Sequence, residues 1–177
     1  MTYTIYDDTP LGSLLLAEEN GSLTGVWMEG QKYGVDFSDK KAERDACSAV
    51  FTQTKAWLDS YFRGERPSAK ELALAPVGRE FRKAVWNILC EIPYGEVTTY
   101  GDIAKQMAVV CGVGKMSAQA VGGAVAHNPI SIIIPCHRVV GSDGNLTGYA
   151  GGIEKKIKLL TLEGVDMDKL YMPKDLL

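Results

Sequence analysis

Residues 116–141, "MSAQAVGGAVAHNPISIIIPCHRVVG", decide both the fold and the chemistry of this chain. The stretch opens with a run of small residues that Ser117 can cap as a helix, and an asparagine-proline pair ends that run. Three isoleucines and a proline then lead to Cys136 and His137. An apolar run usually enters a core, so a cysteine and a histidine at its end are well placed for chemistry.

The small helix predicted after Ser117 contains two adjacent glycines, Gly122 and Gly123. Each glycine costs about 1 kcal/mol in a helix interior relative to alanine, so something must offset that cost. Close approach of another backbone, from protein or nucleic acid, is one explanation. Packing against another helix explains the composition equally well.

A second short helix is predicted just before the first, from Thr98 or Thr99, which can cap it, to the glycine-bearing turn at 111–115. Two short helices around such a turn form the helix-turn-helix pattern, which many DNA-binding proteins share. Many helical hairpins of this kind bind nothing, so the pattern alone leaves the function open.

The rest of the chain predicts an α+β protein of two domains. Residues 3–28 alternate and break at turn residues, which indicates antiparallel strands, and residues 39–65 have helical spacing. The segment 66–78 has two prolines and little periodicity, so we place the domains at 1–75 and 76–177. Residues 79–93 are expected to form a helix, and 153–164 a closing helix whose charged face is solvated.

Composition excludes several classes of protein. The chain has 177 residues, 46% of them hydrophobic and 23% charged, which is ordinary for a globular protein. No apolar stretch approaches the ~20 residues that span a membrane, and the start lacks a basic flank, so we expect a cytoplasmic protein. The four cysteines form no CxxC pair and only two histidines exist, which argues against zinc and disulfides.

The charge distribution is uneven but modest. The net charge is −3, yet residues 76–160 carry 9 basic and 6 acidic side chains, against 8 and 12 in residues 1–75. The basic surplus therefore coincides with the Cys136-His137 segment. By itself it is a weak sign of phosphate binding.

Adjacent cysteine and histidine residues suit nucleophilic chemistry. The thiolate is the nucleophile, and a free thiol with a pKa of about 8.5 needs a neighbouring base to form it at neutral pH. His137 can take the proton, and Glu163 on the last predicted helix can orient His137. From the residues alone, a buried pair without function and a cysteine hydrolase using Cys136, His137 and Glu163 both remain open.

Four motifs together resemble the O6-alkylguanine-DNA alkyltransferases, also called methylated-DNA–protein-cysteine methyltransferases. They are "GEVTTYGDIA", "AVGGAVAHNP", "IIIPCHRVVG" and "GYAGGIEKKIKLLTLEG", and they cover about residues 76–167. The resemblance implies an N-terminal ribonuclease-H-like α/β module followed by a winged-helix-like, helix-turn-helix domain. It also implies that the apolar run before Cys136 is a buried strand or extended segment.

The resemblance implies a single-turnover DNA repair reaction. On this resemblance, the protein binds duplex DNA through the minor groove and flips an O6-alkylguanine out of the helix. O4-alkylthymine is a second candidate substrate. Cys136 then takes the alkyl group irreversibly as a thioether. The partner is double-stranded DNA carrying the lesion, the protein acts as a monomer, and neither metal nor cofactor is needed.

The resemblance also assigns roles to residues of this sequence. Cys136 is the acceptor, His137 its base, Glu163 the orienting acid, Tyr100 the proton donor to the leaving base, and Asn128 a brace between the two halves of the site. The remaining residues line the substrate pocket (Ser131, Pro135, Val139, Tyr149, Ala150 and Gly151) or contact DNA (Thr99, Tyr100, Ser117, Ala118, Gln119, Ala120, Gly122, Gly123 and Arg138).

The sequence departs from the family pattern at two of these positions. Gln119 stands where many members carry an arginine that replaces the flipped base, so we expect weaker and less salt-sensitive DNA binding. Ser131 stands where some relatives have proline beside the pocket, which bears on the alkyl groups accepted. A non-catalytic lesion binder of the same fold would lack Cys136, and an alkylation-sensing transcription regulator would need a further domain.

Overall fold

A computed structural model describes residues 1–39 and 47–172. Contacts along the chain divide it into two compact units, Met1–Val77 with Pro129–Ile133, and Gly78–Asn128 with Ile134–Leu177. The division after Val77 lies two residues from the boundary predicted from the prolines. That residues 129–133 join the first unit was not predicted.

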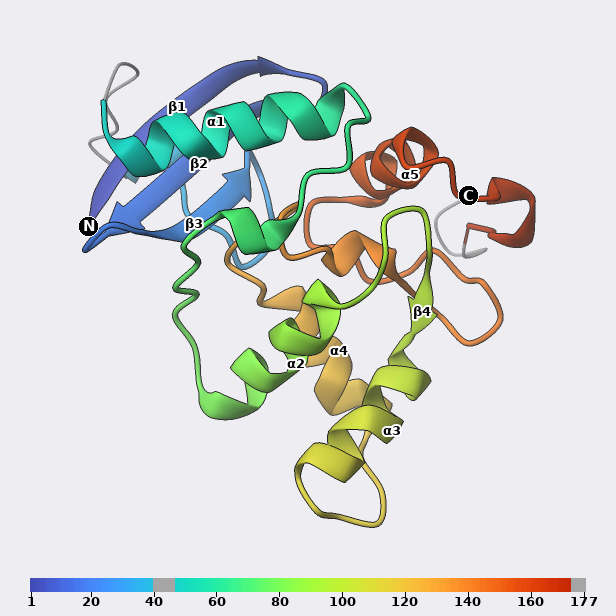
Figure 1. Cartoon of the computed structure of the whole chain (residues 1–177). Helices are drawn as coiled ribbons and strands as arrows, with labels where there is room; N and C mark the ends of the chain where they lie inside the picture. The colour runs from blue at the N-terminus through green and yellow to red at the C-terminus, as the bar shows by residue number, and fades with distance from the viewer. Residues whose placement is uncertain (40–46, 173–177) are drawn as a thin grey trace. The chain divides into compact units, whose positions relative to one another are not determined.

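The first unit is built on an antiparallel sheet of three strands, β1 (Thr2–Thr9), β2 (Gly12–Glu19) and β3 (Ser22–Met28), in the order β1-β2-β3. The strands follow one another through tight turns, as the alternating pattern predicted (Figure 1). Asn20 and Gly21 join β2 to β3 with φ values of 52° and 76°, the left-handed conformation that such hairpin turns require.

Both faces of this sheet are covered. Leu15, Ala17 and Trp27 form a buried cluster on one face. Because side chains alternate along a strand, Leu14 and Leu16 point to the other face, and both are fully buried there. That face packs against helix α1 (Ala49–Phe62), which crosses the strands in Figure 1.

Helix α1 begins where Ser48 accepts a hydrogen bond from the Phe51 amide at 3.1 Å, and Gly64 follows its end with a φ of 77°. The predicted helix started at residue 39, and its first part falls on residues 40–46, outside the described residues. The predicted C-terminal glycine is confirmed.

Residues 129–133 pair with β3 and then turn sharply. The Val26 amide donates to the Pro129 carbonyl at 2.9 Å, and the Ser131 amide donates back to Val26 at 3.0 Å. The Ile133 amide then reaches the Ser131 carbonyl at 2.9 Å, a three-residue turn that holds Ile132 at a φ of 73°. The predicted strand or extended segment is buried as expected, but it extends only to the bridge at Ile130 and is followed by a turn. A β-branched residue in this region is strained, by about 1–3 kcal/mol.

The second unit is mainly helical. Helices α2 (Glu80–Cys90), α3 (Tyr100–Val110) and α4 (Ala118–Ala126) contact one another, with α3 and α4 on either side of the turn at residues 111–117 (Figure 1). The Trp86 indole donates to the Ala124 carbonyl at 2.9 Å and ties α2 to α4. The predicted pair of short helices around a glycine-bearing turn is confirmed.

A two-stranded parallel pair, β4 (Thr98–Thr99) and β5 (Val139–Val140), and helix α5 (Ile153–Leu162) complete this unit. Val140 and Leu160 belong to one buried cluster, which anchors α5 beside the short strand β5. Short 3-10 helices occupy η1 (Phe37–Asp39), η2 (Ala69–Glu71), η3 (Cys136–Arg138) and η4 (Met167–Lys169).

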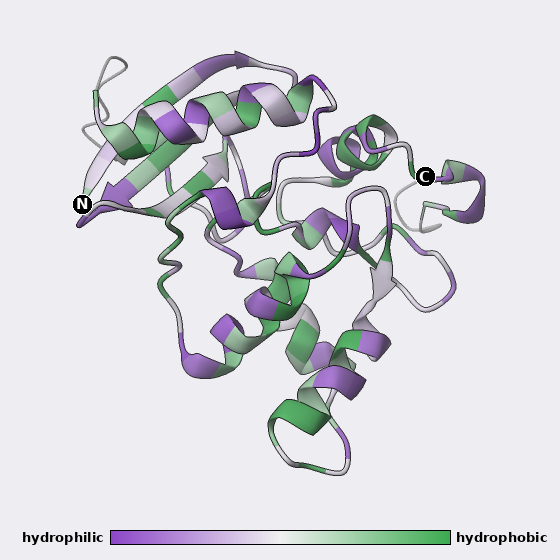
Figure 2. Ribbon diagram, viewed as in Figure 1, coloured by the Kyte–Doolittle hydropathy of each residue, from purple (hydrophilic) through white to green (hydrophobic). Residues whose placement is uncertain are grey.

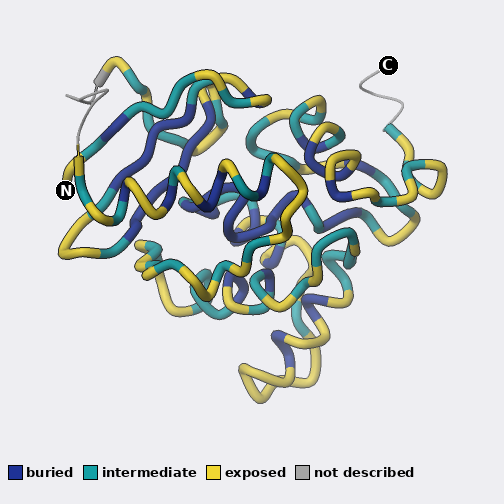
Figure 3. The backbone as a smooth tube through the Cα atoms, turned by 45° about the horizontal axis from the view of Figure 1, so that its top comes forward, coloured by how far each residue is buried: buried dark blue, intermediate teal, exposed yellow. Residues whose placement is uncertain are grey.

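The end of α3 and the turn after it are hydrophobic and exposed. Val109, Val110 and Val113 are 82%, 63% and 46% exposed. Figure 2 shows the last turn of α3 as strongly hydrophobic, and Figure 3 shows the same tip as exposed. Among the described helices, none is both long enough and apolar enough to cross a membrane.

The N-terminus of α4 depends on one side chain. The Ser117 hydroxyl accepts a hydrogen bond from the Ala120 amide at 3.3 Å, and α4 contains two glycines that weaken it. Replacing Ser117 by alanine should therefore lower the free energy of unfolding by about 1 kcal/mol, measured by urea denaturation. Ser117→Thr keeps the hydroxyl and serves as the control. Equal stability of the alanine and threonine variants would contradict the capping role.

Candidate active site

Cys136 is buried at the start of η3, with 5% of the residue exposed. The chain reaches it through an inverse γ-turn, in which the Cys136 amide donates to the Ile134 carbonyl at 2.8 Å around Pro135. The Asn128 amide nitrogen donates both to Ile134, at 2.8 Å, and to the Cys136 sulfur, at 3.2 Å. Asn128 thus holds the turn and the sulfur together.

His137 and Glu163 form a buried hydrogen-bonded pair. His137 Nε2 lies 2.6 Å from Glu163 Oε1, and both side chains are fully buried. Burial would raise the pKa of Glu163, but its contacts with His137 and Arg138 lower that pKa to about 2. The ionised carboxylate can only accept, so Nε2 carries the proton and Nδ1 holds the lone pair. Burial also lowers the pKa of His137, which favours the neutral imidazole.

Glu163 owes its position to the end of α5. It is the C-cap residue of that helix, and its amide donates to the Leu159 carbonyl at 3.0 Å. Besides His137, its carboxylate accepts from the Gly95 amide at 3.1 Å. Gly95 lies in the turn before β4, so the acid joins two segments far apart in the sequence.

Arg138 lies elsewhere than the sequence prediction placed it. We expected it at the DNA, but its guanidinium points into the protein and the side chain is only 11% exposed. Its Nε and Nη2 donate to the two Glu163 oxygens at 2.9 and 3.0 Å, and its Nη1 donates to the Ile92 carbonyl at 2.6 Å. The two-point pairing with a buried carboxylate accounts for this orientation.

Lys156 is a buried cation that the sequence analysis missed. We expected the charged face of the last helix to be solvated, which is wrong for Lys156, whose exposure is 0%. Its ammonium donates to the carbonyls of Val139, at 2.6 Å, and Thr147, at 3.0 Å. The helical spacing could have predicted this burial. Lys156 and Glu163 are seven residues apart, on the same stripe as the buried Leu159 and Leu160.

Opposing influences act on the Cys136 thiol. Burial raises its pKa, whereas the hydrogen bond from Asn128 and the charge of Lys156 act to lower it. Burial has the larger effect, so the free protein holds a thiol rather than a thiolate. Burial of Lys156 lowers its own pKa to about 8, and a negative charge on Cys136 acts to raise it.

Tyr100 begins α3 and lies against the glycine-bearing loop at 147–152. Its hydroxyl is 3.3 Å from the Thr147 carbonyl and 3.5 Å from the Gly148 carbonyl. A Cβ atom on Gly148, which has a φ of 79°, would lie 2.7 Å from that hydroxyl. Burial, and secondarily the Cys136 charge, raise the pKa of Tyr100 to about 12, so it keeps its proton.

The predicted pocket residues lie in different parts of the chain. Tyr149 has a buried hydroxyl whose pKa is raised well above its usual range by burial and then by the charges of Cys136 and Glu163. Val139 is buried beside Lys156, and Ala150 and Gly151 are half-buried in the loop. Ser131 belongs to the first unit, where its hydroxyl bonds the Gln31 side chain at 3.0 Å.

The residues predicted to meet DNA gather at the starts of α3 and α4. Thr99 and Ser117 cap the two helices through the amides of Asp102 and Ala120. Gly122 is half-buried, and a Cβ atom there would lie 3.8 Å from the Tyr100 ring. The exposed side of α4 consists of Ala118, Gln119, Ala120 and Gly123.

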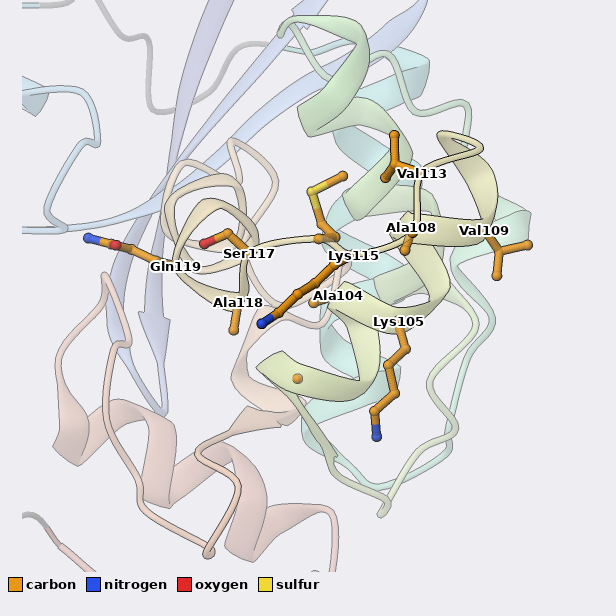
Figure 4. A pocket seen from close by; sticks show the side chains of 12 residues that line it. Ala104, Lys105, Ala108, Val109, Val113, Lys115, Ser117, Ala118 and Gln119 are labelled. Carbon is orange, nitrogen blue, oxygen red and sulfur yellow. The ribbon is translucent and has the colours of Figure 1, made fainter.

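A hollow of about 840 Å³ opens between α3 and the start of α4. Alanines and valines form much of its lining, and the side chains of Lys105 and Lys115 extend on the same side of it (Figure 4). Gln119 also lines this hollow, although its amide points away in the figure. Among the described residues, no cluster of three or more histidine, cysteine or acidic side chains offers a metal site.

Two family descriptions match consecutive parts of the chain. Residues 1–76 match the 6-O-methylguanine DNA methyltransferase ribonuclease-like domain, and residues 80–165 match the DNA-binding domain of the same family. The mixed α+β architecture therefore agrees with the fold class that the resemblance implied.

Individual relatives match this chain over most of their own length. A methylated-DNA–protein-cysteine methyltransferase of Methanosarcina acetivorans is 44% identical over 165 residues, 93% of this chain and 99% of that protein. One of Haemophilus influenzae is 39% identical, over 92% of this chain and 87% of that protein. The crystal structure of Mycobacterium tuberculosis OGT in complex with DNA has 39% identity and a TM-score of 0.77, and covers 99% of this chain and 98% of its own. With both halves matched and relatives of this identity, the chain belongs to the 6-O-methylguanine DNA methyltransferase family.

Proposed function

We propose that the protein repairs DNA by moving the alkyl group of an O6-alkylguanine onto its own Cys136, once per molecule. The observation that carries this function is a buried cysteine that adjoins in the chain a buried, hydrogen-bonded His137–Glu163 pair. The relatives' names and the matched DNA-binding domain support the substrate class. O4-alkylthymine, which presents a similar alkylated oxygen, is proposed as a second substrate.

The proposed reaction is a direct displacement. Cys136 gives its proton to His137, its sulfur forms a bond to the alkyl carbon, and the bond from that carbon to guanine O6 breaks. The thioether product has no group that water can readily hydrolyse, so the protein is consumed. Glu163 stabilises the imidazolium that forms and fixes the tautomer that accepts the proton.

Because the Cys136 thiol is buried, it loses its proton only when the surrounding groups stabilise the anion that forms. The pKa of Cys136 is raised by burial, so little thiolate exists before the substrate arrives. The amide of Asn128 already donates to the sulfur, and the charge of Lys156 also acts to lower the pKa of Cys136, so both would stabilise the anion as it forms. The leaving guanine takes a proton from Tyr100, whose raised pKa keeps that proton available.

Access to the sulfur requires a local opening. Only 5% of Cys136 is exposed, and the Tyr100 hydroxyl is engaged with the carbonyls of the 147–152 loop. We propose that the flipped base displaces this loop and takes over the Tyr100 hydrogen bond. Gly148 and Gly152, both at positive φ, allow such a loop to change its path.

The proposed DNA interface is the exposed side of α4 together with the adjoining hollow. Ala118, Ala120 and Gly123 make α4 slim enough to enter a minor groove, and Gln119 can occupy the place of the flipped base. The ammonium groups of Lys105 and Lys115 can contact phosphates beside that groove (Figure 4).

The two parts of the chain are proposed to differ in role, with residues 76–177 carrying catalysis and DNA binding and residues 1–75 forming the ribonuclease-like part. The chemistry needs one copy of the chain, so we propose a monomer. None of Cys47, Cys90, Cys111 and Cys136 is in a disulfide bond, and we propose a reducing, cytoplasmic location.

The function is tested by incubating the protein with duplex DNA that carries O6-methylguanine and weighing the intact protein. We expect a gain of one methyl group per molecule, located on Cys136, and no gain in Cys136→Ser. Cys111→Ser is the matched control, because Cys111 is an exposed thiol and should leave the gain unchanged. Repeated turnover without a gain in mass would instead indicate that Cys136, His137 and Glu163 form the active site of a cysteine hydrolase.

Glu163→Gln should slow methyl transfer by about 100-fold, because the amide neither fixes the His137 tautomer nor stabilises its cation. The pKa of Glu163 is about 2, below its usual range, so its contribution to stability is present at neutral pH and is lost as the pH falls towards 2. The free energy of unfolding of the variant should therefore decrease less steeply as the pH is lowered. Single-turnover rates and urea titrations measure both effects.

The exposed Glu154→Gln substitution, on the same helix, is the control for Glu163→Gln and should change neither quantity. A Glu163→Gln protein that reacts at the normal rate would contradict the assigned role.

Gln119→Arg should increase DNA affinity and make it more sensitive to salt, because a new cation would meet the phosphate-rich groove. The slope of log affinity against log salt should steepen by about 0.9. Titrations of fluorescent duplex at several salt concentrations measure this slope, with Gln53→Arg on the exposed side of α1 as control. Unchanged affinity and slope would place Gln119 outside the DNA interface.

A further inference from the structure

Arg138 makes more contacts than an arginine in a simple surface ion pair would make. Its Nε and Nη2 donate to the two carboxylate oxygens at 2.9 and 3.0 Å, while its Nη1 donates to Ile92 at 2.6 Å. The guanidinium carbon lies 5.7 Å from the centre of the Tyr94 ring. One side chain thus ties Glu163 to the segment that follows α2.

The carboxylate of Glu163 is shared between two neighbouring residues of η3. Its Oε1 lies 2.6 Å from His137 Nε2 and 3.0 Å from Arg138 Nη2. Because His137 and Arg138 are adjacent in the chain, rotation of the carboxylate away from one disturbs the other. The plane of the guanidinium therefore sets the direction from which Glu163 meets His137.

We propose that Arg138 is a positioning residue for the alkyl transfer: its guanidinium fixes the Glu163 carboxylate and balances its charge, so that His137 stays the neutral proton acceptor. This role rests on the proposed function, and it replaces the DNA contact expected from the sequence. With Arg138 present, the side chains of Arg138, Glu163 and neutral His137 together carry no net charge. Without it, an uncompensated carboxylate beside His137 would favour the imidazolium, which cannot take a proton from Cys136.

The charged groups facing His137 support this balance. Burial has the largest effect and lowers the pKa of His137; Glu163 raises it, and Arg138 and Lys156 lower it. Cys136 adjoins His137, and Tyr149 faces Cys136 and Glu163. Of the cations, Arg138 is the one that bonds the carboxylate itself.

The test compares the pH dependence of single-turnover methyl transfer in the wild type and in Arg138→Met. We expect the rate at neutral pH to fall at least 10-fold and the acid limb of the profile to move to higher pH by one unit or more. The reason is that His137 then stays protonated to a higher pH. The 15N chemical shifts of the His137 ring should show the same change in the free protein, independently of activity.

DNA affinity distinguishes this role from a phosphate contact. Arg138→Met should bind duplex with unchanged affinity and salt dependence. A salt slope reduced by about one, with an unmoved pH profile, would show that Arg138 contacts DNA and would overturn the proposal. Wild-type methyl transfer is measured first, so its absence would refute the proposed function and not the role of Arg138.

A second pair of variants covers the case in which Arg138→Met does not fold, since it leaves a buried carboxylate unpaired. Arg138→Met is combined with Glu163→Gln and compared with Glu163→Gln alone. If Arg138 acts through Glu163, the added substitution should change the rate less than 3-fold. A further large loss would overturn the proposal.

Arg63→Met is the matched control for these measurements. Arg63 pairs with Glu65 through its Nε at 2.8 Å and its Nη2 at 3.0 Å, which is the same two-point geometry. Both side chains are exposed, at 59% and 52%, and lie in the first unit. The control should leave the rate, its pH profile and DNA affinity unchanged.

Discussion

The carboxylate of Glu163 is the centre on which the second unit is organised. It accepts hydrogen bonds from the side chains of His137 and Arg138 and from the amide of Gly95, while the backbone amide of Glu163 caps the end of α5. Burying a charge is costly unless its partners compensate, and here they are supplied by two separate stretches of chain, η3 and the turn at Gly95. The order of these stretches in space is thus coupled to the ionisation of one acid.

This arrangement makes Cys136 inactive until a substrate arrives. The sulfur is buried, its proton is retained, and its base is neutral. Asn128 nevertheless donates to the sulfur, and the charge of Lys156 favours the negative charge that will develop there. A fixed set of donors costs little reorganisation at the moment of reaction, which is how a buried site can speed the transfer.

The sequence predicted the elements whose causes are local. Thr99 and Ser117 cap helices where their spacing indicated, and the turn at Asn20 separates strands as expected. The turn around Ile132 was not predictable, because a β-branched residue at positive φ contradicts local preference and is imposed by pairing with β3. The orientation of Arg138 towards Glu163 depends on a partner 25 residues away, which local patterns do not reveal. The burial of Lys156 follows from its place on the apolar stripe of α5, but its carbonyl partner at Val139 lies 17 residues away and was not predictable.

The buried ammonium of Lys156 has a consequence for alkaline conditions. Thiols ordinarily become better nucleophiles as the medium grows more basic, since more of them ionise. Here Lys156, with a pKa of about 8, loses its charge at a lower pH than the buried Cys136 thiol, whose pKa is raised, loses its proton. The cation that would stabilise the sulfur anion is therefore neutralised before hydroxide favours that anion, so a basic medium brings this protein no simple gain in reactivity.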